Sequence, residues 1–134
     1  TLGSENWVLT SYSNGNLYNT VIPGTSYELS FNEANNIVSG TIDCNSYNSN
    51  YSTANNVPTL GADLVIDYIA PTEMVCPYEI NASDIELEQY NDQNSFVLLA
   101  LSTIDFYKVG AATLNIYSVG GQTLIFEPNT HCEL

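Results

Sequence analysis

The sequence predicts an α+β domain in which one helix packs against a curved antiparallel sheet, or partial β-barrel, of about eight strands. Three observations lead to this prediction. Many short segments alternate apolar and polar residues, as half-buried strands do. Turns rich in glycine and asparagine separate most of these segments. One stretch only, residues 83–101, combines a helix start signal with the length of a helix.

The first part of the chain is expected to form successive antiparallel strands. Asn14-Gly15 is a strong hairpin signal between the first two. Tyr27, Leu29 and Phe31 alternate with polar residues and therefore share one face of the third strand. The predicted strands are residues 7–12, 17–22, 26–31 and 37–42.

Residues 45–58 are rich in Asn, Ser and Tyr, which predicts a surface loop with at most a short strand around Tyr51. Because loops on rigid scaffolds carry much of the binding in proteins, residues 45–56 are the predicted binding loop. Its candidate binding residues are Asn45, Tyr47, Asn50, Tyr51 and Asn55. A strand over residues 64–69 is expected to follow.

The second part of the chain is expected to contain the helix and then a three-stranded meander. Ser83 and Glu86 have capping-box spacing, which predicts that the helix begins after Ser83. It is expected to end near Leu101, and the polar residues 91–94 could divide it into two pieces. Short strands separated by glycine-containing turns follow at residues 105–109, 113–117 and 123–126.

Length and composition predict a single domain, residues 1–134, with its core between residues 7 and 126. The longest apolar run, residues 97–101, is far below the roughly 18 residues that a membrane-spanning helix needs. The chain does not begin with Met. We therefore expect that a targeting segment, with or without a lipid anchor, was removed, or that the chain was trimmed.

The charge is strongly negative, with fifteen acidic residues against one basic residue, Lys108, and a net charge of −14. Nucleic acids and anionic membrane surfaces are recognised through Lys and Arg, so both are poor partners for this chain. Two interpretations remain open. The charge serves solubility or a cold or salty habitat, or it attracts a basic protein partner.

Cys44 and Cys76 each end a strand-like segment, which suggests a disulfide between two parts of the sheet. It would close a loop of about 33 residues and contribute on the order of 3 to 4 kcal/mol. A disulfide implies an oxidising compartment. Cys132 is expected to be free or linked between chains. The alternative, a metal site that adds His131 and Cys132, lacks any Cys-x-x-Cys spacing.

Several motifs occur together, in an order that covers residues 7–126. They are Trp7-Val8-Leu9, Gly40 with Cys44-Asn45-Ser46-Tyr47, Thr72-Glu73-Met74-Val75-Cys76, Phe96, Leu101, Tyr107-Lys108-Val109-Gly110, Leu114-Asn115-Ile116, Gly121 and Leu124-Ile125-Phe126. Together they resemble the META domain, the HslJ-like family of bacterial envelope heat-shock proteins. Two features depart from that pattern: Asp43 stands where glycine is usual, and residues 77–94 are longer than typical.

The resemblance implies a β-rich domain with a helix against a curved sheet, and it implies export. Such domains are often lipoproteins and are associated with heat-shock response, antibiotic tolerance or secretion. The resemblance therefore implies a location in the periplasm, on the outer membrane surface or outside the cell. It implies no defined reaction.

No catalytic arrangement, cofactor site or metal site is predicted, and the protein is not expected to be an enzyme. Nucleophilic catalysis usually needs a histidine base, and the one histidine is His131. Paired carboxylates are the remaining catalytic candidates, but they are expected to be solvated surface charges. They are Asp63 with Asp67, and the group Asp84, Glu86, Glu88 and Asp92.

Ten tyrosines form a further candidate recognition surface. The alternative is that they reflect the preference of tyrosine for strands and barrel rims. Those in or beside predicted loops and strand ends are Tyr12, Tyr18, Tyr47, Tyr51, Tyr68, Tyr78 and Tyr90.

Two functions are therefore carried forward. The first is a non-enzymatic, exported domain, expected to be a monomer, that binds or protects another envelope or secreted protein. The second is a secreted protease inhibitor that presents residues 45–56 from a disulfide-stapled β scaffold.

Overall fold

The computed structural model describes residues 2–54, 61–110 and 112–129. The helical elements are η1 (Leu2–Ser4), α1 (Pro77–Ile80) and α2 (Asp84–Ser102). The strands are β1 (Asn6–Ser13), β2 (Tyr18–Thr20), β3 (Glu28–Asn32), β4 (Ile37–Ile42), β5 (Asn45–Ala54), β6 (Asp63–Ile66), β7 (Ile104–Val109), β8 (Leu114–Ser118) and β9 (Thr123–Pro128).

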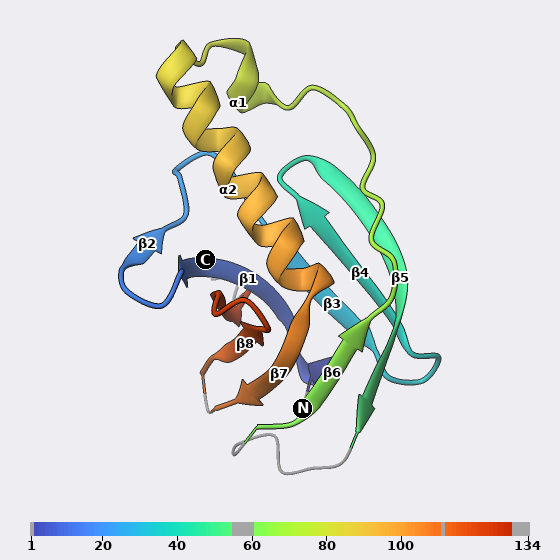
Figure 1. Ribbon diagram of the computed structural model, residues 1–134. Helices are drawn as coiled ribbons and strands as arrows, with labels where there is room; N and C mark the ends of the chain where they lie inside the picture. Colours follow the sequence, from blue (N-terminus) through green and yellow to red (C-terminus); the bar gives the residue numbers. More distant parts are fainter. Residues whose placement is uncertain (1, 55–60, 111, 130–134) are drawn as a thin grey trace, which may run out of the picture.

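The strands form one antiparallel sheet that curls into a nearly closed barrel (Figure 1). Eight of the described strands follow the order β6-β5-β4-β3-β1-β9-β8-β7, and β2 pairs only with β1. The two ends of this path meet at Ala62 and Tyr107, which exchange two backbone hydrogen bonds of 2.9 Å. Helix α2 lies across the opening of the barrel and leads directly into β7 (Figure 1). The predicted fold class is therefore confirmed.

The core fills the inside of this barrel because alternate residues of each strand point inward. Leu29 and Phe31 of β3 are buried beside exposed Ser30, as the alternation predicts. Helix α2 contributes Val97 and Ala100, which are fully buried against the sheet. None of the described helices is long and apolar enough to cross a membrane.

The prediction of a loop over residues 45–58 is wrong for residues 45–54, because these residues form β5. Tyr47 and Tyr51 point inward and are buried, while the residues between them include exposed Asn48 and Asn50. Small polar residues cover the outward face of β5. The alternation of apolar and polar residues is therefore weak in the sequence, because Tyr47 and Tyr51 are the two large side chains on the inward face.

Helix α2 begins as predicted. Ser83 accepts a hydrogen bond from the Glu86 N–H at 3.2 Å, and Glu86 accepts one from the Ser83 N–H at 2.9 Å. The helix is not divided at residues 91–94. Gln93 and Asn94 are hydrogen-bonded to the segment between β2 and β3, so these polar residues fix the helix to the sheet rather than interrupt it.

Candidate functional site

The disulfide between Cys44 and Cys76 is present, with an S–S distance of 2.01 Å. It joins the turn between β4 and β5 to the residue before α1, and Cys76 is fully buried. Since both sulfurs are bonded, neither cysteine is available as a nucleophile or as a metal ligand. His131 and Cys132 lie outside the described residues.

Asn45 holds the segment that leads to Cys76 against β5. Its Oδ1 accepts hydrogen bonds from the Met74 N–H at 2.7 Å and from the Thr72 hydroxyl at 3.0 Å, and its Nδ2 donates to the Met74 carbonyl at 3.1 Å. Thr72 in turn accepts from the Ser46 N–H at 3.1 Å. Asn45, proposed from sequence as a binding residue, therefore has a structural role.

Tyr47 is also structural. It is the cross-strand partner of Gly40, and its ring lies where a side chain at Gly40 would stand. Burial raises the pKa of the Tyr47 phenol well above its usual value. Within the described residues its hydroxyl has no hydrogen-bond partner.

The remaining residues of the predicted binding loop do not form a site either. Tyr51 packs edge-on against Phe31 inside the barrel, with ring centroids 5.0 Å apart. The Asn50 side chain is exposed. The backbone carbonyl of Asn50 accepts a hydrogen bond from the Asp67 N–H at 2.9 Å. Asn55 lies outside the described residues. The five candidate residues are therefore not brought together around a ligand site.

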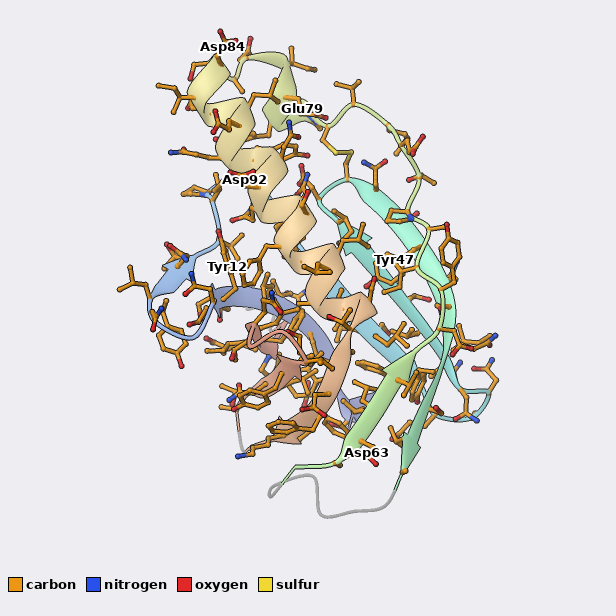
Figure 2. The ribbon with its side chains drawn as sticks, in the orientation of Figure 1. Tyr12, Tyr47, Asp63, Glu79, Asp84 and Asp92 are labelled. Carbon is orange, nitrogen blue, oxygen red and sulfur yellow. A yellow bond between two sulfur atoms is a disulfide. The ribbon has the colours of Figure 1, made fainter. Side chains whose placement is uncertain are left out.

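The carboxylate candidates are scattered. Asp63 and Asp84 lie at opposite ends of the molecule (Figure 2). Glu86 completes the capping box with Ser83, and hydrogen bonds from Ser83 lower the pKa of the Glu86 carboxyl group. Within the described residues, no group of three or more His, Cys, Asp or Glu side chains is placed to hold a metal ion. Of the carboxylates predicted on the helix, Asp92 alone lines a cavity.

The cavity beside Asp92 lies between β2 and α2 and is the best candidate for a binding site in the described part of the chain. We call it the α2–β2 pocket. Its volume is about 570 Å³, which is the size of a small-ligand or side-chain site. Its walls are Tyr12, Tyr18, Asn19, Thr20 and Ile22 on the sheet side and Gln89, Asp92, Gln93 and Phe96 on the helix side.

The pocket combines aromatic faces with one carboxylate. The rings of Tyr12 and Phe96 are in contact, with centroids 4.9 Å apart. Tyr12 and Asp92 lie on the side of the helix that faces β2 (Figure 2). Burial, and secondarily the charge of Asp92, raises the pKa of the Tyr12 phenol. Tyr18 at the other wall is 69% exposed.

A hydrogen-bonded network fixes the helix side of the pocket. Gln93 is 1% exposed, and its Oε1 accepts from the Ile22 N–H at 3.0 Å. Its Nε2 donates to the Tyr27 hydroxyl at 2.8 Å and to the Thr25 hydroxyl at 3.2 Å. Tyr27 donates onward to Asn94. Because a buried network of this kind holds both walls, the pocket has a defined shape without a ligand.

The two features that depart from the META pattern, Asp43 and residues 77–94, are in contact beside the N-terminal half of α2. Asp43 adopts a positive φ of 55°, a conformation that glycine adopts easily and that aspartate tolerates better than most residues. Its carboxylate accepts from the Tyr90 hydroxyl at 2.7 Å and from the Ser26 N–H at 3.3 Å. Tyr90 belongs to the long segment 77–94 and stacks on Tyr78. Asp43 therefore links the turn between β4 and β5 to Tyr90 of helix α2.

Sequence reasoning missed the pocket as a unit. Gln89, Asp92, Gln93 and Phe96 have helical i, i+3, i+4 and i+7 spacing, so their common face was available from the sequence. The sequence does not indicate that β2 faces these residues, because about 70 residues separate the two walls along the chain.

Buried tyrosines make stability sensitive to alkaline pH. Burial is the main cause that raises the pKa of Tyr27 to about 12, against an ordinary value of 10.0. Above pH 10 the unfolded state therefore loses this proton first, and stability falls as the pH rises toward 12. We expect Tyr27 to account for a loss on the order of 2 kcal/mol at pH 12.

Urea unfolding between pH 8 and pH 12 measures this effect. Tyr27→Phe is expected to flatten the decline between pH 10 and pH 12, because phenylalanine has no proton to lose. Tyr68→Phe is the matched control at an exposed position, 85% exposed. Equal slopes for wild type and Tyr27→Phe would contradict the prediction.

Three solved structures resemble this fold over nearly its whole length. A protein from Burkholderia xenovorans, solved by NMR, is 20% identical with a TM-score of 0.65, and the match covers 97% of this chain and 85% of that one. A second NMR structure is 24% identical with a TM-score of 0.60 and coverage of 95% and 91%. A DUF4847 family protein from Bacteroides vulgatus, solved by crystallography, is 11% identical with a TM-score of 0.62 and coverage of 97% and 96%.

These likenesses establish the fold. They carry no information on activity, because the identities are too low. No curated protein matches the sequence. A family model described as META domain matches residues 1–131.

Proposed function

The chain belongs to the META domain family. On this premise we propose that it is a non-enzymatic domain that acts in an oxidising compartment outside the cytoplasm. It acts there by binding or protecting another exported protein. The single observation that supports this proposal best is the Cys44–Cys76 disulfide. Structural disulfides are rare in cytosolic proteins and common in the periplasm, at cell surfaces and in secreted proteins.

A second line of support comes from what the motif residues do. Asn45 and Thr72 hold one segment, Gly40 accommodates Tyr47, and the cysteines are bonded to each other. These residue types could have served chemistry, but each is used in packing or hydrogen bonding. The α2–β2 pocket and its rim are not used in this way and are available for function.

The rim of the pocket suits protein binding. Leu17 and Tyr18, at the tip of the β1–β2 hairpin, are 73% and 69% exposed. Two adjacent exposed side chains of this size, of which Tyr18 also lines the pocket, are typical of contacts with another protein. The protease-inhibitor hypothesis depended on a protruding loop at residues 45–56, and residues 45–54 form strand β5 instead. We therefore do not propose it.

Affinity capture from an envelope extract and from the culture medium of the source organism tests the proposal. Three baits are compared: wild type, Leu17→Ser with Tyr18→Ala, and the matched control Val65→Ser with Tyr68→Ala. The control removes similarly exposed apolar side chains from β6 and the residues after it, at 53% and 85% exposure.

We expect wild type and the β6 control to capture the same protein, and the hairpin variant to capture at least about tenfold less. No specific capture by wild type from either source would contradict the binding function. Equal loss in both variants would show that the contact is not at the hairpin.

A further inference from the structure

The α2–β2 pocket has a chemical character that narrows the kind of partner it fits. This inference rests on the proposed function and deepens it. Asp92 is the one charged residue among those that line the pocket. Aromatic side chains supply the rest of its large surfaces, since Tyr12, Tyr18 and Phe96 all contribute. A carboxylate beside aromatic faces is the combination that attracts cations.

Among the residues that the structure describes, no cationic side chain lines this site. Lys108 is the one lysine, and the sequence contains no arginine. Its ammonium lies 5.9 Å and 5.7 Å from the ring centroids of Phe106 and Tyr117, on β7 and β8. The negative charge of Asp92 is thus left for a group from another molecule. The net charge of −14 also favours the approach of a basic partner.

We propose that the α2–β2 pocket receives an arginine side chain of the partner protein. Arginine fits better than lysine because its planar guanidinium stacks on aromatic rings and donates two parallel hydrogen bonds to a carboxylate. Asp92 accepts those bonds, and the contacting rings of Tyr12 and Phe96 provide the stacking surface. Tyr18, which lines the pocket from β2, covers the apolar stem of the side chain.

The pocket is prepared for this occupant. Gln93 is committed to Ile22, Thr25 and Tyr27, so the wall behind the guanidinium does not have to reorganise on binding. A preformed wall lowers the entropy cost of capturing one side chain. A neutral side chain of the same shape would stack equally well but would not compensate the charge of Asp92.

NMR titration with a short peptide tests the proposal on the intact chain. The probe is acetyl-Gly-Arg-Gly-amide at 150 mM salt, and the matched probes replace arginine with lysine or with citrulline, its neutral isostere. We expect saturable shifts of the backbone amides of Asn19, Gln89, Asp92 and Phe96. Lysine is expected to bind several-fold more weakly, and citrulline about tenfold more weakly.

Two protein variants distinguish a direct contact with Asp92 from attraction by the overall negative charge of the protein. Asp92→Asn is expected to weaken arginine binding about tenfold and to remove the preference over citrulline. Glu88→Gln is the matched control, because it removes one exposed charge one helical turn away without lining the pocket. It is expected to change binding less than twofold. Unchanged amide spectra outside the pocket verify that both variants fold.

Three results would overturn the proposal: shifts that map away from the pocket, equal binding of arginine and citrulline, or equal effects of the two variants. The capture experiment above is independent of this outcome. Hairpin-dependent capture without arginine binding would reject the arginine and keep the binding function. Arginine binding without any captured protein would reject the proposed function instead.

Discussion

Replacing Cys44 and Cys76 together with alanine is expected to lower the free energy of unfolding by about 3 to 4 kcal/mol. The bond joins residues 32 positions apart and so restricts the unfolded chain. In the folded state it also fixes the segment that Asn45 binds, since the Cys76 sulfur lies 3.3 Å from the Cys44 N–H. Urea unfolding followed by the fluorescence of buried Trp7 measures the loss.

Two controls distinguish the disulfide from other effects of removing sulfur. Cys132→Ala makes the same chemical change at the third cysteine and is expected to leave the urea midpoint unchanged. Wild-type protein unfolded with a reductant is expected to approach the stability of the double variant. A double variant with the midpoint of wild type would show that the disulfide does not stabilise the fold.

Gly40→Ala is expected to destabilise the domain by about 3 kcal/mol, which is at the upper end of the usual cost of overpacking. A Cβ atom at Gly40 would stand 2.7 Å from the backbone carbonyl of Glu28 and would also collide with the ring and hydroxyl of Tyr47. Glu28 is paired with Val8 in the β1–β3 ladder, so its carbonyl has little room to move away. The same unfolding measurement reports the change.

Gly110→Ala is the matched control, because the nearest atom to its added Cβ, Thr113 Oγ1, is 3.6 Å away. It is expected to change stability by less than about 0.5 kcal/mol. Combining Gly40→Ala with Tyr47→Leu removes the ring from the collision, so the double variant should lose less than the sum of the single losses. A Gly40→Ala protein as stable as Gly110→Ala would refute the steric account.

Much of the fold could be predicted from the sequence because its strands obey local rules. Tyr27, Leu29 and Phe31 alternate with polar residues, and glycine-containing turns separate the strands near both ends of the chain. Strand β4 was predicted at its observed bounds, Ile37–Ile42. The disulfide was also predictable from two cysteines that each end an alternating segment, although the segment before Cys76 forms no strand. In all these cases the signal lies within a few neighbouring residues.

Strand β5 and the pocket show where local rules stop. In β5 the alternation is present but weak, because Asn and Ser on the outer face resemble a loop. The pocket requires knowing that the β1–β2 hairpin faces α2, and this depends on the long-range hydrogen bond between Ile22 and Gln93. Polar residues of the helix that suggested a break are the ones that make this contact. Their role became visible only with the tertiary structure.

The pairing of β1 with β9 has a consequence for the order in which the molecule is built. The register extends from Trp7 with Pro128 to Ser13 with Thr123, so the first described strand is bonded to the last. As the chain is made from its N-terminus, β1 has no partner on this side until residues 123–128 have emerged. Contacts between such distant segments also slow folding. In a growing chain, β1 therefore cannot pair with β9 before residues 123–128 have been made, so the sheet stays open on this side until then.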